Sequence, residues 1–95
     1  MKIKWSNTAI KNLIFAIEYL EEMGYNEYAA KLESEILIAI EELPSSHLLY
    51  QEDRFRFNND GTFKSFVIHK YRISFRVKSS EVHILRIRQT SRKPK

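Results

Sequence analysis

Apolar residues recur at helical spacing through the first half of the chain. A short alternating segment at residues 2–5 is typical of a β-strand, and Ser6 or Asn7 can then accept a hydrogen bond from the open amides of a helix start. The apolar positions that follow predict one buried stripe on a helix of about five turns. These positions are Ile10, Leu13, Ile14, Ile17 and Leu20. Gly24 stands where a left-handed C-terminal cap is expected.

A second helical pattern begins near Asn26 and is predicted to end at Pro44, because a proline cannot continue the hydrogen-bond ladder. Its apolar stripe consists of Tyr28 or Ala29, Leu32, Ile36, Ile40 and Leu43. The glutamates of this segment lie largely off the stripe and are interpreted as its solvent side. Only a few residues connect the two helices, which predicts an antiparallel helical hairpin.

Strand signals replace the helical spacing in the second half of the chain. Residues 45–53 are predicted to form a loop, and residues 54–57 a short strand that ends at the turn signal Asn58-Asn59-Asp60-Gly61. Residues 63–68 are apolar on nearly every position of both faces, which predicts a central strand. This half therefore supplies most of a sheet.

Two more strands complete the pattern. Residues 71–77 alternate apolar with polar side chains, a turn at Ser79-Ser80 follows, and residues 81–87 repeat the strand character. His69-Lys70 forms the turn before them. The predicted order is β-α-α-β-β-β-β, which is an α+β domain with a helical hairpin packed on a small, mostly antiparallel sheet.

Length and composition limit the classes of protein. A chain of 95 residues is expected to form a single domain over residues 1–95, and 43% hydrophobic residues suffice for one core. The absence of cysteine excludes disulfides, thiol chemistry and cysteine-ligated zinc, and we expect neither a metal nor a cofactor. No apolar run approaches the roughly 18 residues that span a bilayer, and the N-terminal residues lack a signal-peptide core. We therefore expect a cytoplasmic protein that does not enter a membrane.

Charge separates the two halves of the chain. Residues 1–47 carry four Lys and eight Glu, a net charge of −4, whereas residues 48–95 carry twelve Lys or Arg and four Asp or Glu, a net charge of +8. Such segregation indicates a polyanion or an acidic partner at the C-terminal half. The alternative is a solvated basic surface that maintains solubility.

Arginines account for much of this positive charge. Five of them are predicted to form a surface that binds an anion or a target: Arg72, Arg76, Arg86, Arg88 and Arg92. Any single arginine has an equally good alternative, as a cross-strand partner of a glutamate or a surface side chain that lies along apolar neighbours. For all five this is a poor account, because only Glu81 is near in sequence to neutralise them.

The order of the elements and two sequence segments together resemble the RelE/ParE superfamily, the toxins of type II toxin–antitoxin modules, over essentially the whole chain. The residues that carry the resemblance are Trp5, Ser6, Ala9, Leu13 and Tyr19, the segments 71–75 and 82–87, and Ser91-Arg92-Lys93-Pro94. The resemblance implies a small basic toxin in a hetero-oligomer with a cognate acidic antitoxin, whose C-terminal segment wraps and blocks it. It implies DNA gyrase as the target in the ParE-like branch, without enzymatic activity, and ribosome-dependent cleavage of mRNA in the RelE-like branch.

Cleavage of RNA requires a proton acceptor for the attacking hydroxyl, cations at the phosphate and a proton donor for the leaving group. Arg72 follows Tyr71 as a phosphate-binding arginine does in the RelE-like branch. Arg92 matches a second arginine of that branch just after the last strand, and Lys64 matches one basic residue of its central strand. His69 and His83 are the remaining candidates for proton transfer.

This set is incomplete, and the question of an endoribonuclease stays open. Phe66 stands where the RelE-like branch shows a further basic residue, and no tyrosine follows Tyr71. The long helices, the compact hairpin and the Ser-Arg-Lys-Pro segment favour the ParE-like branch. A third alternative is an inactive remnant or an RNA-binding module on the same fold.

Overall fold

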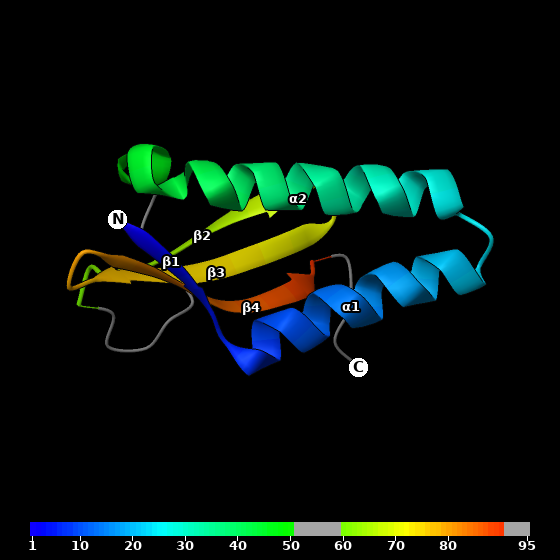
Figure 1. Cartoon of the computed structure of the whole chain (residues 1–95), viewed down its shortest axis with the longest axis horizontal. Helices are drawn as coiled ribbons and strands as arrows, with labels where there is room; N and C mark the ends of the chain where they lie inside the picture. Colours follow the sequence, from blue (N-terminus) through cyan, green and yellow to red (C-terminus); the bar gives the residue numbers. More distant parts are fainter. Residues whose placement is uncertain (51–59, 91–95) are drawn as a thin grey trace.

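Two helices cover one face of a four-stranded sheet in the computed structural model, which describes residues 1–50 and 60–90 (Figure 1). The elements are β1 (Lys2–Trp5), α1 (Asn7–Glu22), α2 (Asn26–Ser46), a 3-10 helix (His47–Leu49), β2 (Phe63–Ile68), β3 (Tyr71–Lys78) and β4 (Glu81–Gln89). The predicted α+β fold is confirmed. The strand predicted at residues 54–57 lies outside the described residues.

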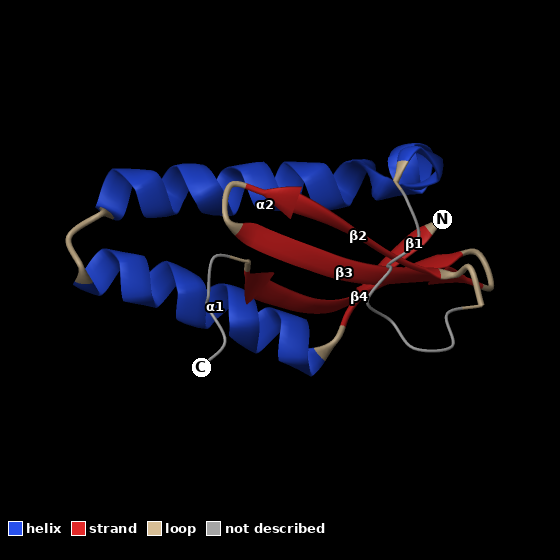
Figure 2. Ribbon diagram, turned by 180° about the vertical axis from the view of Figure 1, so that it is seen from behind, coloured by secondary structure: helices blue, strands red, loops and turns tan. Residues whose placement is uncertain are grey.

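The sheet has the strand order β1-β4-β3-β2. The first strand, β1, runs parallel to the last strand, β4, and the other neighbouring pairs are antiparallel, as Figure 2 shows from behind. Residues 63–68 form the predicted strand as β2, which pairs with β3 and stands last in the described sheet, and its central position stays a prediction. On the face away from the helices, the Arg76 guanidinium covers Phe63, and Val67 is 49% exposed.

Helix α1 begins and ends with the predicted caps. The Ser6 hydroxyl accepts from the Ala9 amide at 2.9 Å, which satisfies one open donor of the first turn. At the other end Gly24 has a φ of 86°, and the Tyr25 amide donates back to the Leu20 carbonyl at 2.9 Å. This is the glycine-dependent termination that the sequence predicted.

The predicted apolar stripe of α1 is partly wrong. Leu13, Ile17 and Leu20 are buried, but Ile10 is 42% and Ile14 51% exposed. The buried face turns instead toward Ala9 and Ala16. The face that Ala9, Leu13, Ala16, Ile17 and Leu20 share packs in the core, so the two isoleucines lie on its flank.

Helix α2 buries the predicted stripe, with Ala29 and not Tyr28 as its first member. The prediction that Pro44 ends it is wrong, because the helix continues to Ser46. Pro44 lies in the last turn, where its missing amide removes a single bond, and the His47 amide still donates to Leu43. None of the described helices is long and apolar enough to cross a membrane.

One core lies between the helices and the sheet. The largest fully buried side chains are Phe75, Leu32, Ile36, Ile40, Leu43, Ile73, Ile84 and Val82. They come from α2, β3 and β4 and alternate along each strand with side chains on the opposite face. That opposite face is uncovered by either helix, and it presents the polar positions of the sheet.

Candidate functional site

Strand β4 changes its alternation at Leu85. On one side of this residue Ile84 pairs with Phe75, and on the other Arg86 pairs with Ser74, so Leu85 is the extra residue of a β-bulge. Buried Ile84 is followed by buried Ile87, three positions later. The bulge therefore brings Arg86 and, two positions on, another arginine to the face away from the core. The sequence carried this signal in its apolar spacing, which the strand prediction overlooked.

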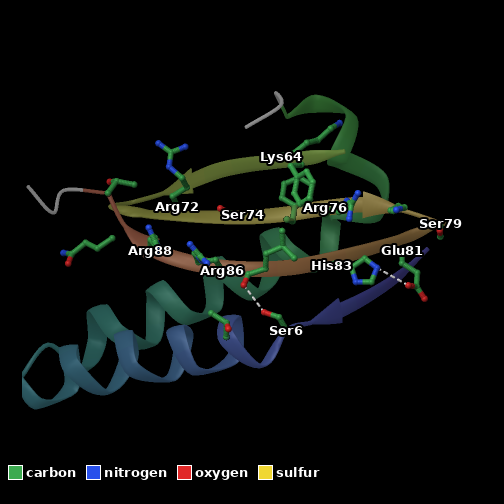
Figure 3. A pocket seen from close by; sticks show the side chains of 17 residues that line it. Ser6, Lys64, Arg72, Ser74, Arg76, Ser79, Glu81, His83, Arg86 and Arg88 are labelled. Atoms are coloured by element: carbon green, nitrogen blue, oxygen red, sulfur yellow. Dashed lines mark hydrogen bonds and ion pairs between the residues drawn. The ribbon is translucent and has the colours of Figure 1, made fainter. Parts of the chain in front are cut away.

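The uncovered face is a broad basic depression with a volume of about 990 Å³ (Figure 3). Three strands supply its cationic side chains, which register or lining position assigns to this face. They are Lys2 and Lys4 on β1, Arg72, Arg76 and Lys78 on β3, and Arg86 and Arg88 on β4. Glu81 is the acidic strand residue among the lining side chains. We call this surface the basic face.

Arg76 is held within the fold. Its Nε donates to the Thr62 hydroxyl at 2.9 Å, its terminal nitrogen lies 3.3 Å from the Asp60 carboxylate, and its guanidinium carbon lies 4.4 Å from the centre of the Phe63 ring. Hydrogen bonds from Thr62, together with the Arg76 charge, lower the pKa of Asp60 below 3.8. Asp60 therefore neutralises one of the five arginines, which the sequence analysis missed.

Three other arginines form a group that we call the arginine cluster: Arg72, Arg86 and Arg88 (Figure 3). Arg72 lies directly opposite Arg88 across β3 and β4, and it donates to the Ser65 hydroxyl at 3.3 Å. Within residues 1–50 and 60–90, neither Arg86 nor Arg88 makes a hydrogen bond or an ion pair, and both are exposed. Two exposed guanidinium groups on one face, those of Arg86 and Arg88, can bind a planar anion such as a carboxylate or a phosphate.

Histidine 83 lies on the basic face but away from the arginine cluster. It pairs with Arg76, further along β3 than Arg72, and its Nε2 is 3.1 Å from the Glu81 carboxylate. The other oxygen of Glu81 lies 3.4 Å from Lys4 Nζ. His83 is thus held by Glu81 at the opposite end of the face.

Histidine 69 faces the helices and not the arginine cluster. It occupies the turn between β2 and β3 with a φ of 54°, and its Nε2 lies 3.0 Å from the Glu35 carboxylate of α2. The ring of Tyr28 meets it edge-on, with ring centres 5.6 Å apart. The contact joins the turn to α2.

Lysine 64 points toward the helices as well. Its register partner is Phe75, which is buried, and its Nζ donates to the His47 carbonyl at 3.0 Å. Although Lys64 borders the depression, its ammonium is engaged at the end of α2. The structure thus places the Lys64 ammonium at the end of α2, whereas Arg72 belongs to the basic face.

The predicted nuclease residues are therefore dispersed. Arg72 and His83 share the basic face but lie apart, whereas His69 and Lys64 contact α2 or its end. Arg92 lies outside the described residues. In the described ranges no group of three or more His, Cys, Asp or Glu side chains is arranged to hold a metal ion. The arrangement as described suits anion binding better than proton transfer.

Comparison with known proteins agrees with the fold. Residues 3–94 match the family model described as ParE toxin of type II toxin-antitoxin system, parDE. No protein with a curated description matches the sequence.

Two solved structures share the fold. The chromosomal ParDE system from P. aeruginosa has a TM-score of 0.75 and 22% identity, with 96% of this chain and 97% of that chain covered. The toxin–antitoxin complex RelBE2 from Mycobacterium tuberculosis has a TM-score of 0.54 and 21% identity, with 93% and 95% covered.

Proposed function

This chain belongs to the ParE toxin family of type II toxin–antitoxin systems, and we propose that it inhibits growth by binding DNA gyrase through its basic face. An acidic cognate antitoxin neutralises it in this proposal. The toxin acts here by occupying its target, without cutting a nucleic acid.

The arginine cluster is the observation that carries the proposal. Arg86 and Arg88 are exposed and, in the described part of the chain, unpaired, and Arg72 stands opposite Arg88. Guanidinium groups bind carboxylates and phosphates in a planar, two-pronged geometry, so three of them on one face favour an acidic partner surface. Dispersal of His69 and Lys64 onto the helix side counts against the RNA-cleaving alternative.

The antitoxin is proposed to neutralise the same cluster. The two structural neighbours are toxin–antitoxin systems by their titles, which supports a protein partner for this chain. A negatively charged segment laid across β3 and β4 would pair with the exposed guanidinium groups of Arg86 and Arg88. Reversal of Arg72, Arg86 and Arg88 to Glu is expected to abolish co-purification of the two proteins. A complex that still forms after this charge reversal would contradict the proposed contact between the antitoxin and the arginine cluster.

A supercoiling assay with purified gyrase tests the proposed target. We expect the unaltered chain to inhibit supercoiling and the variant Arg86→Ala/Arg88→Ala to lose this inhibition. Lys11→Ala is the matched control, because it removes an exposed positive charge from α1. Unimpaired gyrase together with cleavage of ribosome-bound mRNA would replace the proposal with the RelE-like alternative.

A further inference from the structure

We propose that Ser6 and Asn12 are positioning residues, which hold the Leu85 bulge so that Arg86 and Arg88 point outward. The inference rests on the proposed role of the basic face, because it concerns how that face is assembled. Ser6 and Asn12, at and near the start of α1, thereby help to shape the binding surface on β4.

The start of α1 takes over as the neighbour of β4 where β1 ends. β1 pairs with β4 only up to Ile84, and β4 continues to Gln89. At that point the Ser6 amide donates to the Ile84 carbonyl at 2.9 Å, and the Ser6 hydroxyl donates to the Leu85 carbonyl at 2.9 Å (Figure 3). A helix terminus therefore replaces a strand along this edge.

Asn12 holds the backbone on the other side of the bulge, and we call the hydrogen bonds of Ser6 and Asn12 to β4 the clamp. Its side-chain oxygen accepts from the Ile87 amide at 3.0 Å. The carbonyl of Leu85 and the amide of Ile87 flank Arg86, so its backbone lies between two fixed groups. Both Ser6 and Asn12 are half-buried, which limits competition from water for these bonds.

The clamp fixes the direction in which the backbone bends at the bulge, which the packing of the core does not fix. Burial of Ile84 and Ile87 requires one extra residue between them, but it does not fix the direction in which the backbone of that residue bends. A bulge carries unpaired groups that a partner must satisfy. Ser6 and Asn12 satisfy them, and they thereby fix the direction of Arg86 toward Arg72 and Arg88.

Substitutions at Ser6 separate the clamp from the helix cap. The Ser6 hydroxyl both accepts from Ala9 and donates to Leu85. Ser6→Gly is well tolerated at a helix N-cap, but it has no hydroxyl to donate to the Leu85 carbonyl and adds no charge to the basic face. Ser6→Thr keeps both functions. Asn12→Ala removes the acceptor for Ile87 and leaves the cap intact.

The probe is tripolyphosphate, a compact polyanion that several guanidinium groups can bind together. We expect Ser6→Gly and Asn12→Ala to weaken its binding about tenfold, because Arg86 and Arg88 are no longer held in place, and Ser6→Thr to bind normally. Hydrogen exchange of the Ile87 amide is measured in parallel and is expected to accelerate in Asn12→Ala.

A double-mutant comparison distinguishes positioning from general destabilisation. In the Arg86→Ala/Arg88→Ala background, Asn12→Ala is expected to cause no further loss of affinity. Unchanged affinity in Asn12→Ala despite faster exchange at Ile87, or an equal loss in both backgrounds, overturns the inference. If Asn12→Ala does not fold, the comparison of Ser6→Gly with Ser6→Thr decides, since both residues are tolerated at the N-cap and neither changes the charge. Gyrase is absent from this experiment, so failure of the proposed target leaves its outcome unaffected.

Discussion

The arginines of the basic face are expected to separate into one that stabilises the fold and others that serve binding. Arg76→Ala removes a hydrogen bond to Thr62 and the contact with the Phe63 ring. Arg86→Ala and Arg88→Ala remove no hydrogen bond or ion pair with any described residue. The three changes are chemically identical, so the difference between them measures the environment alone.

The expected magnitudes follow from the contacts. A cation–π contact at a partly exposed site contributes about 0.5–1 kcal/mol, and one hydrogen bond about 0.5–1.5 kcal/mol. The Arg76 side chain is 27% exposed, and its exposed ion pair with Asp60 is left out of the sum. Arg76→Ala is therefore expected to lower the free energy of unfolding by about 1–2.5 kcal/mol, against less than about 0.5 kcal/mol for the other two.

Urea unfolding followed by fluorescence is the assay. Trp5 is the only tryptophan, and it is half-buried against the core, so its emission reports the folded state. Lys78→Ala, at an exposed position on the same strand, is the control for loss of a positive charge. Equal stability of Arg76→Ala and Arg88→Ala would show that the contacts of Arg76 with Thr62 and Phe63 do not stabilise the fold.

Three further outcomes are expected. Ser80 has a φ of 60°, so Ser80→Gly should raise the free energy of unfolding by about 0.5–1 kcal/mol, seen as a higher melting temperature, whereas the control Ser34→Gly within α2 should lower it. Burial, followed by the neighbouring Tyr28 and Tyr19, raises the pKa of Tyr71 above 10.0; its neutral form is favoured by folding, so stability is retained below pH 10 and lost above it. Urea midpoints on either side of pH 10 should show a shallower decline in Tyr71→Phe, and an unchanged slope contradicts this. His69→Ala should leave growth inhibition unchanged, because the ring contacts Glu35, and loss of inhibition in a folded variant would revive the nuclease alternative.

Local sequence signals predicted the elements well where a single residue type determines the backbone. Ser6 caps α1, and Gly24 adopts the positive φ that ends it. Pro44 misled because a proline in the last helical turn costs one bond and does not terminate the helix. Ile10 and Ile14 misled because the closest packing of α1 follows its alanines, which a hydrophobic count undervalues.

The candidate site was only partly predictable, since it depends on contacts between distant segments. Arg72, Arg86 and Arg88 were identified from composition and alternation, but their common direction requires the bulge at Leu85. Asp60 neutralises Arg76 from the turn before β2, 16 positions away, and sequence proximity to Glu81 concealed this. Lys64 was matched to a basic residue of the RelE-like branch, and its pairing with Phe75 turns it toward the helices, which the sequence alone did not indicate.

The order in which DNA synthesis and protein synthesis stop in cells tests most directly whether the toxin acts on gyrase through the arginine cluster. Thymidine and leucine incorporation are followed within minutes of inducing this chain without an antitoxin, beside the variants Arg86→Ala/Arg88→Ala and Lys11→Ala. If the basic face binds gyrase, DNA synthesis stops first with the unaltered chain and with Lys11→Ala, and it continues with the variant Arg86→Ala/Arg88→Ala. Protein synthesis that stops first, or arrest of DNA synthesis by the arginine variant, would contradict it.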